Sequence, residues 1–340
     1  MEYRYRDKAY LSNYSLDTRL FDSFDFLVED AAPIRSVYVL NTDKGMKILK
    51  KVDYGLEELD FLYEALKTIR KKYPYVINFR ESTDGRPYVK YENGIYVVLD
   101  IIEGRDCIFE NPLDLKKAAS ALSKLHEAGE AVEDRHATRS NLGRLLDKYQ
   151  EKLSALIKYR EIAAMHVNKS DFDIMYLKHV DYYTDCIKRA YSHIQESRYK
   201  ELCSAKHTLC HHDLAHHNIL MGKDDNVYFI DFDYSVIDLP YHDLSNIITK
   251  AIKHNGWEID FANLVLEGYM ENRELAREEI EVLYGYLLFP QDFFDISANY
   301  YMRNRGWDEE DFRDKLKRKA EYREDRERFL KEFENRWLKG

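Results

Sequence analysis

Three oxygen-bearing side chains stand at a fixed spacing in one short segment. Asp213 lies two positions after His211, Asn218 follows Asp213 by five residues, and Asp231 ends a short apolar stretch. Carboxylate and amide oxygens are hard donors, which suit Mg²⁺ better than softer metals. We therefore interpret Asn218 and Asp231 as candidate magnesium ligands and Asp213 as a candidate proton acceptor.

The chemistry that needs such a set is phosphoryl transfer from ATP. That reaction requires an incoming hydroxyl held in line and a phosphate charge neutralised by one or two Mg²⁺ ions. Asp213 would accept or orient the hydroxyl proton, Asn218 would reach a Mg²⁺, and Asp231 would bind the metal that bridges the phosphates. Protein-kinase-like phosphotransferases space an Asp, an Asn and a second Asp in this way. The segment therefore predicts a phosphotransferase that uses ATP and Mg²⁺.

The histidines around Asp213 leave a second interpretation open. A metal hydrolase could bind Zn²⁺ or Fe through His211, His212, Asp213, His216 and His217. Adjacent residues of a strand, however, point to opposite faces. The loop also lacks the i, i+4 helical spacing of zinc-protease ligands. We therefore favour the phosphotransferase over the hydrolase.

The segment that carries the three side chains follows the pattern strand, loop, strand, turn, strand. Residues 219–221 are apolar, Asp224-Asp225-Asn226 is a turn signal, and residues 227–231 are typical of a short buried strand. This order brings the three side chains together at one edge.

Strand and helix patterns before residue 103 follow the order β-β-α-β-β-β. Turn signals separate the strands, and the helix has leucine and isoleucine at 3-4-3 spacing. The expected strands are 34–40, 45–52, 75–79, 87–91 and 94–102, and the expected helix is 57–72.

Helical periodicity dominates from Asp114 onward, with expected helices from 114 and over 172–194, 243–254, 258–271, 276–289 and 307–338. We predict an α+β protein with a two-lobed protein-kinase-like fold. Its β-rich nucleotide-binding lobe would span residues 1–102, with a hinge at about 100–104. Its mainly helical lobe would span 105–340 and carry the catalytic loop 209–231.

A kinase-like small lobe needs a strand lysine to hold the α- and β-phosphates and a glutamate on the following helix to support it. Of three lysines between residues 47 and 51, Lys50 follows an apolar pair, as in the pattern Val-Ala-Ile-Lys. We therefore expect Lys50 to bind phosphate. Glu58 is the expected partner because it lies one turn before a leucine of the apolar stripe, and Glu57 and Glu64 are alternatives.

Residues 96–102 would carry the hinge whose backbone groups bind adenine, so Asp100 and Ile102 are expected beside the nucleotide. One usual part is missing, because there is no Gly-x-Gly-x-x-Gly between Ala31 and Gly45. Such a loop lets backbone N–H groups approach phosphates closely. Phosphate must then be held by Lys50, by the metal, or by this hairpin used differently.

Four further polar residues could support the site. His126 could buttress the catalytic loop or be a half-buried helix histidine. Asp233 could reach metal or water. Asp238 and Asp243 are expected to make structural hydrogen bonds to the loop backbone.

Composition narrows the class of protein. The 340 residues are 45% hydrophobic, which is enough for a sizeable core, and the net charge of −10 argues against a general nucleic-acid binder. The four cysteines have no C-x-x-C spacing, so we expect free thiols in a reducing compartment. No run approaches the roughly 18 apolar residues of a membrane span, and the first residues carry no apolar signal region. We expect a soluble protein made in the cytoplasm.

The chain resembles the aminoglycoside phosphotransferase and choline kinase group. In that group the catalytic loop reads His-Gly-Asp-Leu-His-x-x-Asn, and the metal segment reads Ile-Asp-Trp/Phe-Glu/Asp, then Gly-Asp-Pro-x-x-Asp-Leu. The corresponding residues here are 211–218, 230–233 and 237–244. More narrowly, the chain is similar to the CotS family of spore-coat proteins from endospore-forming bacteria, through residues 102–107, 111–115, 176–183, 210–218 and 289–294.

This resemblance implies a kinase-like fold, a catalytic role for Asp213, metal roles for Asn218 and Asp231, and a link to the spore coat. The acidic antibiotic pocket of the aminoglycoside kinases is not recognisable here, so antibiotic resistance is not expected. Two hypotheses follow. The chain is either a Mg²⁺- and ATP-dependent kinase of a hydroxyl on a small molecule, sugar or coat component, or a coat-assembly protein that binds other spore-coat proteins. The missing glycine loop and the 28 tyrosines motivate the second hypothesis.

Overall fold

The computed structural model describes residues 18–34, 37–134 and 137–340. Contacts group the chain into two compact units that are not two consecutive blocks of sequence. The first unit contains residues up to Cys107 together with 131–139 and 216–233. The second contains residues 108–130, 140–215 and 234–340. The lobe boundary expected at residues 100–104 stays a prediction.

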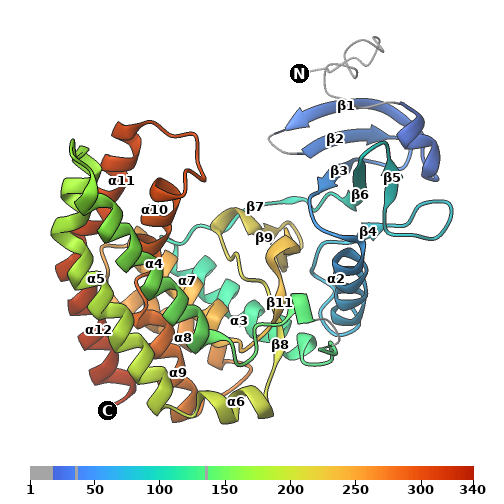
Figure 1. Cartoon of the computed structure of the whole chain (residues 1–340). Helices are drawn as coiled ribbons and strands as arrows, with labels where there is room; N and C mark the ends of the chain where they lie inside the picture. The colour runs from blue at the N-terminus through green and yellow to red at the C-terminus, as the bar shows by residue number, and fades with distance from the viewer. Residues whose placement is uncertain (1–17, 35–36, 135–136) are drawn as a thin grey trace. The chain divides into compact units, whose positions relative to one another are not determined.

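An antiparallel sheet with the order β1-β2-β3-β6-β4, and with β5 also paired to β6, dominates the first unit (Figure 1). Most of the predicted strands and the predicted helix are present, within a few residues of their expected bounds. The elements are η1 (Thr18–Ser23), β1 (Val28–Ile34), β2 (Val37–Thr42), β3 (Lys47–Val52), α2 (Leu56–Ile69), β4 (Phe79–Arg80), β5 (Val89–Tyr91) and β6 (Gly94–Asp100).

Alternation along β3 decides which of its side chains are available for chemistry. Leu49 is fully buried in a cluster with Leu40 and Val98 on one face of the sheet. Val52 packs with Leu59 of α2 on the other face. Since successive side chains of a strand point to opposite faces, Lys50 shares the face of Val52. Each buried aliphatic side chain contributes about 1.5–3 kcal/mol, which fixes this register.

The strand expected over residues 75–79 is wrong for most of its length. Val76 forms only an isolated bridge, and its partner is Phe229. The N–H of Ile77 donates to the Phe229 carbonyl at 3.1 Å, and the N–H of Phe229 donates to the Tyr75 carbonyl at 3.1 Å. These backbone groups are therefore used by the segment that carries Asp231 rather than by a neighbouring strand of the main sheet.

The segment between residues 208 and 238 follows the predicted strand, loop, strand, turn, strand order. In the first unit β7 (Gly104–Asp106), β9 (Ile219–Gly222) and β10 (Val227–Phe229) form a three-stranded sheet. In the second unit β8 (Thr208–Cys210) pairs with β11 (Val236–Asp238). Three short 3₁₀ turns complete the connections: η2 (Ala137–Arg139), η3 (His216–Asn218) and η4 (Phe232–Tyr234).

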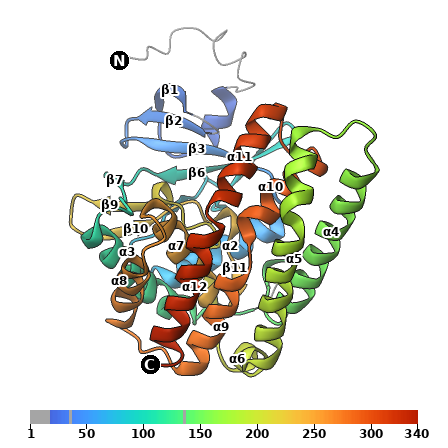
Figure 2. The ribbon, with the colours of Figure 1, turned by 90° about the vertical axis from the view of Figure 1, so that its left-hand side faces the viewer.

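Helices make up most of the second unit. Figure 2 shows α4 and α5 side by side, and α3 packs against α8. The helices are α3 (Pro112–Gly129), α4 (Leu145–Met165), α5 (Asp171–Glu196), α6 (Tyr199–Ala205), α7 (Tyr241–His254), α8 (Ile259–Met270), α9 (Arg277–Leu288), α10 (Gln291–Tyr301), α11 (Glu309–Glu321) and α12 (Arg323–Trp337). Capping fixes the start of α5, where the Ser170 hydroxyl accepts from the Asp173 N–H at 3.1 Å.

The single helix expected over residues 307–338 is wrong, because two helices meet at Tyr322. This residue ends α11 and begins α12 with φ −80° and ψ 9°, outside the helical region. Helical periodicity continues on both sides, so the charge-rich pattern hides the break. The break lets the two helices bury different residues, Leu316 on α11 and Phe329 on α12.

In the described part of the chain, none of the four cysteines forms a disulfide. Three are buried, and Cys203 is partly exposed. Within the described residues, no helix has both the length and the apolar composition needed to cross a membrane.

Candidate nucleotide-binding and phosphate-transfer site

Lys50 is the centre of a charged cluster in the first unit. Its Nζ lies 2.6 Å from Oδ1 of Asp231 and 2.7 Å from Oδ2 of Asp233. Burial alone would lower the pKa of Lys50, but the charges and hydrogen bonds of the two carboxylates outweigh it and raise this pKa. The lysine chosen from the sequence is therefore a charged ammonium between two carboxylates.

Asn218 and Asp231 stand at adjoining ends of the β9–β10 hairpin. Ile219 pairs with Phe229, and the Ile230 N–H donates to the Asn218 carbonyl at 3.0 Å. The register of this hairpin thus brings together two residues that are 13 positions apart in the sequence.

The backbone of Asp231 is strained, because its φ is 63°. A left-handed conformation in a residue other than glycine costs about 1–3 kcal/mol and persists where the surroundings impose it, often at functional sites. Aspartate tolerates this region better than most residues. In the second unit His212 has the same property, with φ 64°. Asp231 is itself a candidate metal ligand, and His212 directly precedes Asp213.

The donor atoms in the first unit suit a hard cation. Asn218, Asp231 and Asp233 offer only oxygen, the donor type that Mg²⁺ prefers. The carboxylates of Asp231 and Asp233 already converge on one cation, the Lys50 ammonium. Mg²⁺ therefore fits these residues, and Asp233 joins the two candidate ligands that the sequence predicted.

The hydrolase hypothesis finds no matching cluster. A metal site of this kind needs at least three His, Cys, Asp or Glu side chains close together. Among the described residues, one such group has its ligand atoms within 4.8 Å of one another, and it consists of His126, Cys210 and Asp243. All three are buried, and none belongs to the five residues of that hypothesis. The cluster instead makes the hydrogen bonds described below.

Glu58 pairs with Arg139 rather than with Lys50, so the expected partner of Lys50 is wrong in this structure. The Arg139 Nε lies 3.0 Å from Glu58 Oε1, and the Gly55 N–H donates to Glu58 Oε2 at 3.2 Å. Arg139 also donates to the Asp233 carbonyl at 2.5 Å. Glu58 is occupied by capping α2 and by the guanidinium, whereas Lys50 is held by two aspartates.

Asp100 is the last residue of β6, and Ile102 lies two residues beyond it. The Asp100 carboxylate accepts from Arg80 Nε at 2.7 Å and from Asn78 Nδ2 at 2.9 Å, and it lies 3.2 Å from Lys47 Nζ. Burial would raise the pKa of Asp100, but these three partners outweigh it and lower this pKa. The Asp100 side chain therefore anchors the strand end, and the role of both residues beside adenine stays a prediction.

Asp213 lines a cavity of about 600 Å³ in the second unit. Its Oδ1 accepts from Lys250 Nζ on α7 at 3.1 Å. Its N–H donates to Nδ1 of the fully buried His211 at 3.3 Å. The side chain is 38% exposed, so a small molecule in the cavity can reach the carboxylate.

A buried carboxylate holds the loop that precedes Asp213. Asp243 accepts from the His211 N–H at 2.6 Å and from the His212 N–H at 2.9 Å, and it lies 3.2 Å from Nε2 of the fully buried His126. His126 also hydrogen-bonds to the Tyr269 hydroxyl at 2.9 Å. The expected bonds from Asp243 to the loop backbone are confirmed, and His126 buttresses the loop through Asp243.

The sequence reasoning missed two residues, one in each unit. Arg139 is 81 positions from Glu58, and no spacing rule connects them. Lys250 lies seven residues after Asp243 on α7. Seven residues are about two helical turns, so both side chains lie on the same face of the helix, near the loop. A search for basic residues on the helix that follows the metal segment would have found Lys250.

Comparisons with known proteins show which proteins the chain is similar to. The chain is 25% identical to spore coat protein S of Bacillus subtilis (strain 168) over 304 residues, which cover 87% of this chain and 86% of that protein. An aminoglycoside phosphotransferase from Alicyclobacillus acidocaldarius has a TM-score of 0.80 at 16% identity, covering 96% of this chain and 97% of that one. A spectinomycin phosphotransferase in complex with ADP and spectinomycin has a TM-score of 0.63 at 14% identity, covering 90% and 93%.

The structural similarity shows a kinase-like α+β fold, as predicted, with an N-terminal sheet region followed by a largely helical part. Choline kinase LicA from Streptococcus pneumoniae also shares this fold, with a TM-score of 0.53 at 16% identity over 95% of this chain and 99% of that one. A family model described as spore coat putative kinase YutH matches residues 17–333. The chain therefore belongs to the spore coat putative kinase YutH family.

Proposed function

We propose that this chain is a phosphotransferase that uses Mg²⁺ and ATP to phosphorylate a hydroxyl group. The observation that carries the proposal is the cluster of Lys50, Asp231 and Asp233, in which the ammonium of a strand lysine lies 2.6 and 2.7 Å from the two carboxylates. Fold alone would not support an activity, whereas this cluster supplies the charges that phosphoryl transfer needs.

Each residue has a separate task in this proposal. Lys50 holds the α- and β-phosphates, while Asn218, Asp231 and Asp233 hold the metal. When bound, Mg²⁺ neutralises the phosphate charge. Asp213 accepts the proton of the acceptor hydroxyl. The hydroxyl oxygen bonds to the γ-phosphorus as the bond to the ADP oxygen breaks. Asp100 and Ile102 lie beside the adenine.

We further propose that the reaction serves the spore coat. The similarity to spore coat protein S supports this setting, as does the family description. The chain would be made in the cytoplasm and then deposited in the coat, with a hydroxyl-bearing acceptor and other coat proteins as partners.

A coat-assembly role without catalysis is the second candidate. The sequence from Val28 to Thr42, which contains β1 and β2, has no glycine, so backbone N–H groups there are poorly suited to approach phosphates. Residues 35–36, between these two strands in the sequence, lie outside the described residues. Because assembly needs no nucleotide, a folded protein that does not bind Mg·ATP would favour this second candidate.

Lys50 and its strand neighbour Lys51 give a matched test. Lys50→Met should weaken binding of a non-hydrolysable ATP analogue with Mg²⁺ about tenfold or more, equivalent to about 1.4 kcal/mol, because it removes the cation that faces the phosphates. Lys51 is exposed on the same strand, so Lys51→Met should bind like the wild type. Calorimetry on the three proteins measures both affinities, and equal affinity in all three would contradict the role of Lys50.

A further inference from the structure

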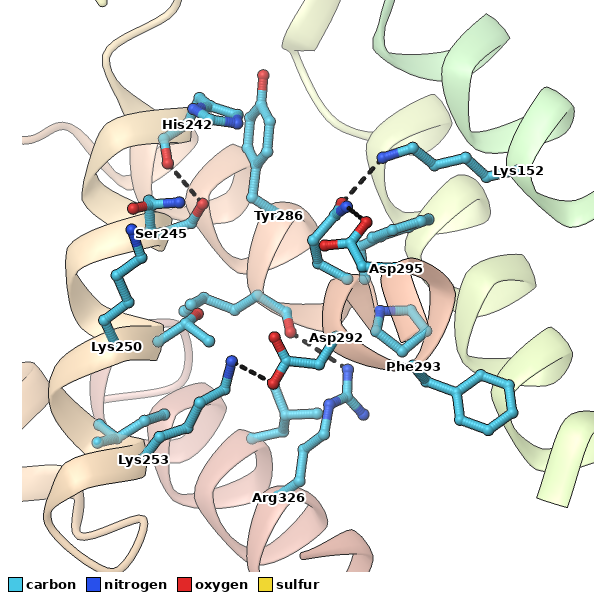
Figure 3. A pocket seen from close by; sticks show the side chains of 18 of the residues that line it. Lys152, His242, Ser245, Lys250, Lys253, Tyr286, Asp292, Phe293, Asp295 and Arg326 are labelled. Carbon is cyan, nitrogen blue, oxygen red and sulfur yellow. Dashed lines mark hydrogen bonds and ion pairs between the residues drawn. The ribbon is translucent and has the colours of Figure 1, made fainter. Parts of the chain in front are cut away.

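Ten of the 30 residues that line the cavity containing Asp213 have charged side chains. Figure 3 shows lysines from α4 and α7 that point into it from opposite sides. Six lining residues are lysine or arginine, and four are aspartate. This positive excess occurs in a chain whose net charge is −10, so it is a local property of the cavity.

Most of the carboxylates in the lining are already neutralised. Asp292 lies 2.5 Å from Lys253 Nζ and 3.1 Å from Lys319 Nζ. Asp213 pairs with Lys250 at 3.1 Å. Burial raises the pKa of a further aspartate, Asp295, and so favours its neutral form. Even with the fourth aspartate, Asp238, counted as charged, the six lysine and arginine residues outnumber the four aspartates by two.

Lys148 and Lys152 on α4 are those remaining cations. Lys148 donates to the amide oxygen of Asn141 at 2.5 Å, and Lys152 donates to that of Gln291 at 2.9 Å. In the described part of the chain, neither ammonium lies within ion-pairing distance of a carboxylate. Lys152 also lies 4.8 Å from the centroid of the Phe289 ring.

The electrostatics of this lysine pair favour an anion. Burial lowers the pKa of both lysines, and the charge of Lys148 lowers the pKa of Lys152 further. Attraction by Asp238 raises the pKa of Lys148 and attraction by Asp295 raises that of Lys152, but the net shift of both stays downward. A partly desolvated cation without an ion-paired carboxylate is costly, and a bound anion would reduce that cost. A cationic amine, in contrast, would add a third positive charge.

We propose that the acceptor is an anionic hydroxyl compound whose carboxylate or phosphate group binds Lys148 and Lys152. This inference rests on the proposed phosphotransferase function. The cavity volume of about 600 Å³ suits a small molecule. The acceptor hydroxyl oxygen bonds to the γ-phosphorus of ATP, the bond to the ADP oxygen breaks, and the hydroxyl proton passes to Asp213, whose carboxylate lines the same cavity.

Four probes of similar size test the charge preference. Glycerol 3-phosphate carries a phosphate group and glycerate carries a carboxylate. Glycerol is neutral, and 3-amino-1,2-propanediol is cationic. Calorimetry on the full chain without nucleotide should show at least about tenfold tighter binding of one or both anions than of glycerol, with no binding of the amine. Comparison of the two anions identifies phosphate or carboxylate as the group bound.

A double variant and a control on the same helix locate the effect. Lys148→Met with Lys152→Met should remove the preference for the anion, while Lys158→Met, at an exposed position of α4, should keep it. Lys148→Gln serves as a milder variant if the double variant does not fold. A folded wild type that binds glycerol or the amine as tightly as the anions would overturn the inference, as would an unchanged preference in the double variant.

The proposed function fails by a different result. Loss of nucleotide binding would remove the kinase assignment but leave anion binding measurable, since the probes are titrated without ATP. Conversely, a protein that binds Mg·ATP but prefers neutral or cationic probes keeps the kinase assignment and loses the anionic acceptor.

Discussion

Replacing Asp213 with asparagine should lower phosphate transfer about a thousandfold and leave nucleotide affinity unchanged. General base catalysis by a positioned side chain contributes about 10²–10⁴-fold, and an amide oxygen is too weak a base to take the hydroxyl proton. The side chain keeps its size, so the cavity and the loop bonds of His211 and Asp243 remain. Formation of ADP, with an acceptor or with water, measures the rate.

Asp185→Asn provides the control for this substitution. Asp185 lies on α5 with its side chain 68% exposed, far in the sequence from the loop, so ADP formation should match the wild type. Equal rates in wild type and Asp213→Asn, with nucleotide bound in both, would show that Asp213 does not act as the base.

Asp243→Asn should destabilise the protein by about 3 kcal/mol, the scale for removing one partner of a buried charged network. Both carboxylate oxygens accept backbone N–H groups of the loop, from His211 and His212. An asparagine must turn its NH₂ group toward one of these donors, which leaves a buried N–H without an acceptor. Urea unfolding of the variant measures the loss, and Asp185→Asn should change stability by less than about 0.5 kcal/mol.

The Asp243 carboxylate also predicts how the stability of the folded protein changes with pH. Burial alone would raise the pKa of Asp243, but hydrogen bonds from the His126 and His242 side chains outweigh it and hold this pKa well below its usual value. A group with a depressed folded-state pKa stabilises the fold above its unfolded value of about 3.9 and loses that contribution as the pH falls. The wild type should therefore lose stability more steeply than Asp243→Asn below about pH 4. Parallel curves would show that folding does not lower the pKa of Asp243.

Local patterns predicted those parts of the site that lie close together in the sequence. The hairpin of β9 and β10 was predictable because turn residues separate two apolar runs, and this hairpin alone brings Asn218 near Asp231. Lys50 was predictable because strand alternation places it opposite the buried Leu49. In both cases a periodicity of the backbone converts residue spacing into geometry.

Contacts between distant segments were not predictable in the same way. Glu58 has a capping role that its position at the third residue of α2 suggests, yet its ion pair with Arg139 depends on how residues 131–139 pack in the first unit. The cations of the cavity come from α4, α7, α11 and α12, and each helix contributes only one or two of them. A charge pattern distributed over several helices has no signature in any one segment.

Calorimetric titration of a non-hydrolysable ATP analogue, with and without Mg²⁺, on the wild type and Asp231→Asn, tests the central claim most directly. The proposed site predicts binding that needs Mg²⁺ in the wild type and is abolished in the variant, because Asp231 supplies a metal-binding carboxylate beside Lys50. Thermal unfolding would establish that both proteins are folded. The account would be contradicted if neither folded protein bound the nucleotide, or if both bound it equally without Mg²⁺.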